Sequence, residues 1–117
     1  MRVRSFITLC VAGLSLSLAA FGAVNSPVAD AAMKRDRAAV RGLVGQKADV
    51  NAPQADGATA LQWAAYNSDL ETADMLIAAG ANVKAANHDG ATPLYLASLE
   101  GSAPMIDKLL QPPRSWD

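Results

Sequence analysis

The segment DGATALQWAA, residues 56–65, decides the fold, because it returns as DGATPLYLA at residues 89–97. The two copies are offset by 33 residues and share an Asp-Gly pair, a threonine, a leucine and an alanine at matched positions. A fixed period of about 20–50 residues is typical of repeat proteins, in which neighbouring supersecondary units stack and bury a shared core. The sequence therefore predicts a stacked array rather than one closed core.

Within one unit, turn residues and apolar residues together predict two short helices. Asp56-Gly57 indicates a turn, because glycine adopts positive φ without steric cost. Thr59 and Asp69 are the expected N-caps of the two helices, and Gly80 is expected to end the second helix in the left-handed conformation. Both helices carry an apolar stripe at i, i+3 and i+4 spacing, made by Leu61, Ala64 and Ala65 and by Ala73, Leu76 and Ile77.

Shifting the frame by one period in either direction gives two further units. Thr92-Pro93 and Ser26-Pro27 each place proline at the first helical position, where its missing N–H is not needed. Asp36 is the expected second N-cap of the first unit. Lys47 stands where glycine is expected and Gly42 lies inside a helix, so the first unit should be the loosest. The predicted repeats are residues 23–55, 56–88 and 89–117.

These residues resemble the ankyrin repeat over about residues 26–111. The resemblance is carried by Asp89-Gly90-Ala91-Thr92-Pro93-Leu94, Thr59-Ala60-Leu61 with Ala64-Ala65, Gly80-Ala81-Asn82-Val83 and Ala48-Asp49-Val50-Asn51. It implies an all-α solenoid of about three stacked helix-turn-helix units with β-turn fingers. It also implies a binding surface on the fingers and first helices, and no catalysis. Gln62 and Tyr95 replace the histidine of the family's pattern, which puts its usual inter-repeat hydrogen bond in question.

The first residues resemble a secretory signal peptide. Arg2 and Arg4 precede an uncharged, mostly apolar run, and small residues follow it. Cleavage after Gly22 is favoured over cleavage after Ala31, because Ala31 falls within the first repeat. The alternative is an uncleaved N-terminal anchor, although the apolar run is barely long enough to span a bilayer. We expect a signal peptide at residues 1–22 and an exported repeat domain, periplasmic or secreted, at residues 23–117.

Composition excludes several classes of function. A net charge of −1 argues against nucleic-acid binding, which selects a clear excess of lysine and arginine. The chain has one cysteine, Cys10, and one histidine, His88, whereas a structural zinc site needs about four such ligands. No disulfide can form within one chain. We therefore expect no cofactor, no bound metal and no membrane association after signal cleavage.

The candidate site residues lie on the predicted fingers and at the exposed ends of the first helices. They are Asp56, Tyr66, Asn67, His88, Asp89, Leu99 and Glu100. His88 beside Asp89 also fits a metal ligand or general base, but no second histidine or nucleophile accompanies it, so an exposed finger residue is favoured. Trp63 aligns with Leu96 and is expected to pack. A solvated helix face is favoured over a binding patch for the basic residues Lys34, Arg35, Arg37, Arg41 and Lys47.

The sequence thus predicts a module, not an enzyme, that binds an unidentified protein partner. Two alternatives stay open. The chain can be an inhibitor or accessory subunit of an exported enzyme. It can also be a truncated remnant of a longer ankyrin repeat protein, because Pro112-Pro113 interrupts the repeat pattern before its closing loop.

Overall fold

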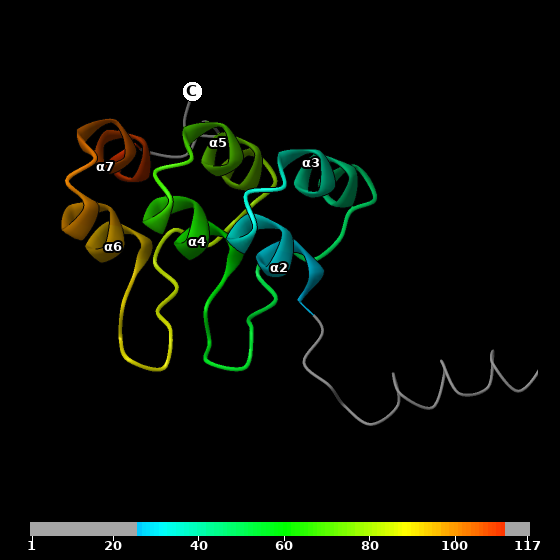
Figure 1. Cartoon of the computed structure of the whole chain (residues 1–117), viewed down its shortest axis with the longest axis horizontal. Coiled ribbons are helices and arrows are strands. Elements are labelled where there is room, and N and C mark those ends of the chain that lie inside the picture. Colours follow the sequence, from blue (N-terminus) through cyan, green and yellow to red (C-terminus); the bar gives the residue numbers. More distant parts are fainter. Residues whose placement is uncertain (1–25, 112–117) are drawn as a thin grey trace, which may run out of the picture.

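The computed structural model of the protein describes residues 26–111, which form six helices and no strands (Figure 1). The helices are α2 (Pro27–Met33), α3 (Arg37–Gly45), α4 (Ala60–Tyr66), α5 (Leu70–Ala78), α6 (Pro93–Glu100) and α7 (Ala103–Leu110). The predicted all-α array of three helix pairs is confirmed. The predicted signal peptide lies outside the described residues.

The helices form two layers. Each unit contributes a pair, and the first helices α2, α4 and α6 stack on one another, as do the second helices α3, α5 and α7. The segments that join the units project beyond the first helices as two fingers (Figure 1). We define the first finger as residues 54–58 and the second finger as residues 87–91; two backbone hydrogen bonds close each of them.

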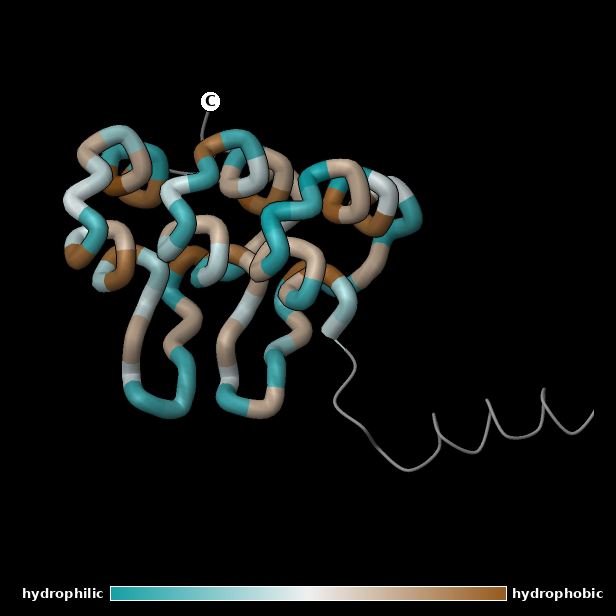
Figure 2. Tube along the Cα trace, in the orientation of Figure 1, coloured by the Kyte–Doolittle hydropathy of each residue, from teal (hydrophilic) through white to brown (hydrophobic). Residues whose placement is uncertain are grey.

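Small residues allow the first helices to pack closely. Ala60, Ala64 and Ala65 of α4 are fully buried, and α4 packs against both α2 and α6. Between the two layers, larger apolar side chains such as Leu61 and Leu76 complete the core. Figure 2 shows hydrophobic segments along the inside of the layers and hydrophilic residues at the tips of the fingers. The apolar stripes predicted from the i, i+3, i+4 spacing therefore form the shared core.

Side-chain caps begin most of the helices. Asp36 and Asp69 accept hydrogen bonds from the backbone N–H groups three residues ahead, as predicted. Thr59 occupies the N-cap position of α4 but makes no capping hydrogen bond, so that part of the prediction is wrong. Its backbone (φ −102°, ψ 169°) matches that of Thr92 (φ −103°, ψ 165°), which does cap its helix. The φ and ψ of Thr59 itself are therefore not what prevents the capping bond.

Left-handed residues end the helices where the period requires them. Gly80 has φ +94°, as predicted. The matched residue one period earlier, Lys47, adopts φ +62° although it is not glycine. A left-handed residue with a side chain costs about 1–2 kcal/mol. At this position the first unit therefore carries a backbone strain that the second avoids, whereas Arg35 (φ +60°) and Ser68 (φ +54°) give both units a left-handed residue after the first helix.

The turns of the two fingers differ in what surrounds their glycines. Gly57 has φ +85°, and a Cβ there would lie 2.7 Å from Cδ2 and 3.0 Å from the backbone nitrogen of His88. Gly90 has φ +84°, and a Cβ there would meet no atom within 4 Å. Both positions therefore need glycine for its positive φ, but only position 57 also needs it because a side chain would collide with His88.

We expect Gly57→Ala to destabilise the protein more than Gly90→Ala does. Both substitutions carry the cost of a left-handed alanine, but only the first forces the fingers apart, which adds about 1–3 kcal/mol. Chemical denaturation followed by circular dichroism measures the difference. Equal free energies of unfolding for the two variants would show that the contact between the fingers contributes nothing.

Candidate functional site

The two fingers are held side by side by their backbones. The His88 N–H donates a hydrogen bond of 2.9 Å to the carbonyl oxygen of Asp56. Within the first finger, the Asp56 carboxylate accepts from the Ala58 N–H at 3.0 Å. Within the second, the side-chain oxygen of Asn87 accepts from two backbone N–H groups, those of Asp89 and Ala91, each at 2.9 Å. The finger surface is therefore preorganised before any ligand arrives.

Trp63 and Gln54 join the first finger to α4 and α2. The indole N–H of Trp63 donates to the side-chain oxygen of Gln54 at 2.7 Å, and the Gln54 amide donates to Asp30 of α2 at 2.7 Å. The Trp63 ring is half-buried and meets Tyr66 edge to face, with the ring centroids 5.7 Å apart. Trp63 thus packs, as predicted, and it also positions the more exposed Tyr66.

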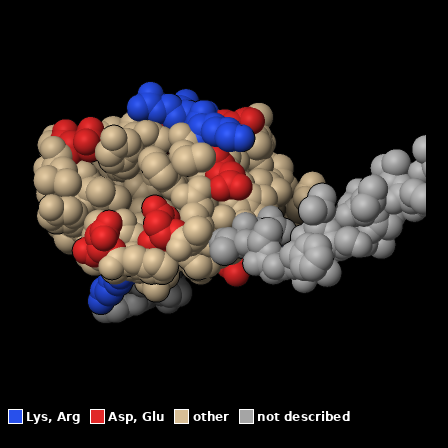
Figure 3. Space-filling view, turned by 60° about the horizontal axis from the view of Figure 1, so that its bottom comes forward, with Lys and Arg blue, Asp and Glu red and all other residues tan. Residues whose placement is uncertain are grey.

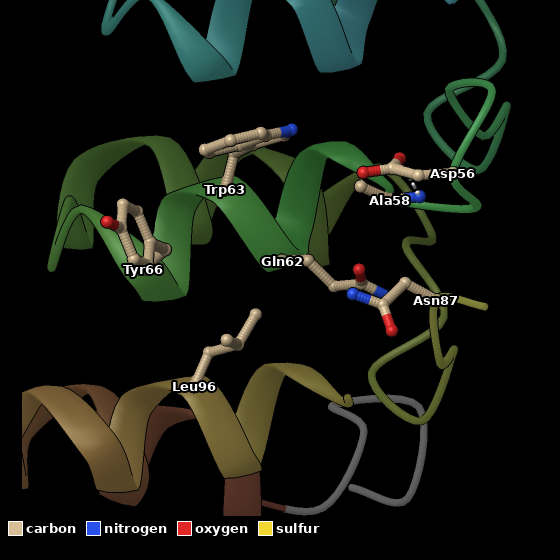
Figure 4. A pocket seen from close by; sticks show the side chains of 7 residues that line it. All are labelled: Asp56, Ala58, Gln62, Trp63, Tyr66, Asn87 and Leu96. Atoms are coloured by element: carbon tan, nitrogen blue, oxygen red, sulfur yellow. Dashed lines mark hydrogen bonds between the residues drawn. The ribbon is translucent and has the colours of Figure 1, made fainter. Parts of the chain in front are cut away.

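A hollow of about 90 Å³ lies between the fingers and the first helices (Figure 4). We call it the finger hollow. It takes residues from the first finger, α4, the second finger and α6. They are Asp56, Ala58, Gln62, Trp63, Tyr66, Asn87 and Leu96. In Figure 4, Gln62 and Asn87 lie near Asp56 at one end of the hollow, and Tyr66 lies towards the other end. One end is therefore polar and the other largely apolar.

Gln62 is the buried polar residue of the finger hollow. It is only 2% exposed, and its side-chain amide donates to the backbone carbonyl of Ala85 at 2.8 Å. Ala85 precedes the second finger, so this bond joins α4 to the segment that leads into that finger. Because a carbonyl only accepts, the bond fixes the orientation of the amide. The Gln62 oxygen, Oε1, has no partner among the described residues.

The structure brings some of the predicted site residues together and separates others. Asp56 and Tyr66 line the finger hollow, and Asp89 lines a second, adjoining hollow along with Tyr95. The remaining predicted residues lie outside both hollows: exposed His88 on the second finger, exposed Leu99 and Glu100 at the end of α6, and half-buried Asn67. The Asn67 amide donates to the carbonyl of Ala32 at 3.3 Å and so ties α4 to α2.

Five residues of the finger hollow were not predicted as site residues: Ala58, Gln62, Trp63, Asn87 and Leu96. Gln62 occupies a position that the family pattern assigns to histidine, and that departure was the one available signal. Asn87 lies on the second finger and Leu96 on α6, far along the chain from α4, so their part in the hollow depends on how the repeats stack.

Ion pairs link neighbouring second helices. Two of them involve basic residues of the first unit. Arg37 contacts Asp69 at 2.9 Å and Arg41 contacts Glu71 at 3.1 Å. Asp69, almost fully buried, also accepts from Thr72 while it caps α5. Figure 3 shows the molecule with the fingers turned forward; acidic side chains are spread over this face, most basic side chains gather along one edge, and a smaller basic group lies at another. These contacts agree with a solvated, structural role for the basic residues.

No three histidine, cysteine or acidic side chains within residues 26–111 gather as possible metal ligands. None of the helices in that range has the length and apolar character needed to cross a membrane.

The geometry agrees with what comparison of the sequence with protein families finds. The family described as "Ankyrin repeats (3 copies)" matches residues 28–115, which is most of the chain. The match begins within α2 and extends past α7, so it includes every residue of both fingers. A search of curated proteins finds no match.

We expect Gln54→Ala to lower the free energy of unfolding by about 1–2 kcal/mol, because it leaves the half-buried indole N–H of Trp63 without its acceptor and removes the link to Asp30. Gln46→Ala, at an exposed position after α3, is the matched control and should change stability by less than about 0.5 kcal/mol. Urea denaturation measures both. Indistinguishable midpoints for the two variants would contradict this role of Gln54.

Proposed function

The chain belongs to the ankyrin repeat family, and on that premise we propose that it is a non-catalytic module that binds a protein partner across its fingers and first helices. Ankyrin repeats are generally protein-interaction modules, and the family is typically non-catalytic. An inhibitor or accessory subunit of an exported enzyme is one form that such binding can take.

One observation carries the proposal: an exposed apolar row at the same position of three successive repeats. Met33, Tyr66 and Leu99 end the first helices and are 38%, 50% and 63% exposed. They are spaced by one period, so the stacking places them along one side of the array. Exposed apolar groups that adjoin one another mark interaction surfaces, and tyrosine and methionine are enriched at interfaces. The row lies beside the finger hollow, to which it contributes Tyr66.

We further propose that the protein is exported and acts in the periplasm or outside the cell. The support comes from sequence: Arg2 and Arg4, the apolar run after them, and the small residues up to Gly22. Ala31, the alternative cleavage position, is buried within α2, where cleavage would remove part of the first repeat. This supports cleavage before residue 23.

Mass spectrometry of the protein recovered from the producing cell tests export. We expect the extracytoplasmic fraction to contain a chain that begins at Ala23 and therefore lacks Cys10. Recovery of the intact chain from the cytoplasmic fraction alone would contradict the proposal, and recovery of the intact chain from membranes would favour the uncleaved anchor.

Partner capture with purified bait tests the binding surface. We expect Tyr66→Ala and Leu99→Ala each to reduce recovery of a partner about tenfold, because truncating an interface anchor costs about 1–2 kcal/mol. Leu110→Ala is the matched control, since Leu110 is as exposed as Leu99 but lies on α7, away from the fingers. If both surface variants recover the partner as well as the control does, this surface is not the binding site.

A further inference from the structure

We infer that the outer side of the second finger binds an extended segment of the partner, with a flat side-chain ring seated on Gly90. The inference rests on the proposed function, since it adds a further part of the surface that a protein partner contacts and states the chemistry that fits there. It is argued from the way in which the molecule's own residues 85–88 cover the first finger.

Residues 85–88 cover the first finger through a backbone hydrogen bond and a ring. The His88 N–H donates to the Asp56 carbonyl at 2.9 Å. The His88 ring lies so close to Gly57 that a Cβ there would be 2.7 Å from Cδ2 and 3.1 Å from Nε2. A finger of this shape therefore holds an extended segment that offers a backbone donor and a flat ring.

The second finger has the same backbone as the first. Gly90 has φ +84° and Gly57 has φ +85°. The second finger is closed by hydrogen bonds from the Asn87 N–H to the Ala91 carbonyl and from the Gly90 N–H to the Asn87 carbonyl, and matched bonds close the first finger. A segment that fits against one finger therefore fits, by shape, against the other.

The second finger is open on the side that is covered in the first. In Figure 1 the first finger lies on one side of the second finger, and no described segment lies on the other. A Cβ at Gly90 would meet no atom within 4 Å, and the Asp89 carbonyl accepts no hydrogen bond from the backbone of residues 26–111. A hollow of about 490 Å³, which we call the outer hollow, lies here. It is lined by Asn87, Asp89, Gly90, Ala91, Tyr95 and Leu96.

Helix α6 adds an aromatic side chain to the outer hollow. Tyr95 stands one period after Gln62, whose amide donates to the Ala85 carbonyl at 2.8 Å. Gln62 is 2% exposed, whereas Tyr95 is 54% exposed. The tyrosine O–H is a donor suited to a carbonyl of a bound segment, and its ring provides apolar surface together with Leu96. The outer hollow therefore matches a segment with free backbone groups and a ring better than it matches a lone charged group.

The occupant is a segment of a different protein and not a second copy of this chain. Residues 85–88, the segment of this chain that fits such a finger, are already held by the first finger. A bound partner segment continues the interface between the fingers by one further segment. Backbone hydrogen bonds at an open edge, with side chains in adjoining pockets, are a recurring mode of peptide recognition.

The test is an NMR titration of the full-length, ¹⁵N-labelled chain with the peptide acetyl-Ala-Ala-Asn-His-amide, which copies residues 85–88. Two reference peptides each lack one contact: the first has alanine in place of histidine, and the second has a methyl group on the backbone nitrogen of the histidine. We expect saturable shifts of the Gly90 amide with the copied peptide, and dissociation constants about fivefold larger with either reference. Equal binding of the three peptides, shifts at Gly57 in place of Gly90, or no saturable shift would overturn the inference.

Matched variants locate the peptide. Gly90→Ala places a Cβ where the ring is expected and should weaken binding of the copied peptide about tenfold. Gly101→Ala is the control and should leave binding within about twofold. Gly101 also has a positive φ (+71°) and open space around it, but it lies at the end of α6 far from the second finger. Equal effects of the two variants would overturn the placement on Gly90.

Tyr95→Ala tests the outer hollow without changing a glycine. Because Tyr95 is exposed, the variant should fold, and it should weaken binding of the copied peptide about threefold. Unchanged binding would remove α6 from the site and overturn the assignment to the outer hollow.

The free chain reports on a second copy as the occupant. We expect the Gly90 amide signal to stay in place as the protein concentration is raised without peptide. A shift that grows with protein concentration would assign the outer hollow to a second copy and overturn the inference.

The inference and the proposed function can fail separately. If Tyr66→Ala and Leu99→Ala abolish capture of the partner while the copied peptide does not bind, the interaction surface stands and the assignment to the outer hollow falls. If the copied peptide binds as expected but capture is unaffected by either variant, the proposed surface falls.

Discussion

Burial of the alanine face of α4 between α2 and α6 is the constraint on which the rest of the structure depends. Ala60, Ala64 and Ala65 are fully buried, and no larger side chain at these positions would let the first helices approach as closely. Since α4 contacts a first helix on each side, it sets the spacing of all three repeats. The spacing of the repeats in turn fixes how far apart the two fingers lie.

The candidate site follows from that spacing. At the distance set by the helices, the His88 N–H reaches the Asp56 carbonyl, and only glycine fits at position 57 without displacing His88. The same registration brings Leu96 of α6 to the hollow that Tyr66 of α4 lines, and this closes one side of the finger hollow. A repeat array with slightly different spacing would keep the same residues and lose the hollow.

The fold was predictable because it is encoded locally and three times. The Asp-Gly turns, the caps Asp36 and Asp69, and the left-handed position of Gly80 are properties of short segments, and the period of 33 residues confirms each against its counterpart. The site was only partly predictable, because side-chain rotation and contacts between repeats leave no such local signal. Thr59 has the backbone of a cap and makes no capping bond, while Gln62 makes a hydrogen bond to the segment before the second finger that its residue type alone did not predict.

Amide hydrogen exchange of the native, full-length chain tests most directly whether the middle repeat organises the molecule. In a stacked array, stability is the sum of each repeat and its interfaces, and only the middle unit has two interfaces. We expect the slowest exchange in α4 and α5, with faster exchange in α2 and α3, whose unit contains the left-handed Lys47 and a glycine within α3. Slowest exchange in α2, α3 or α7, or uniform exchange across all six helices, would contradict it.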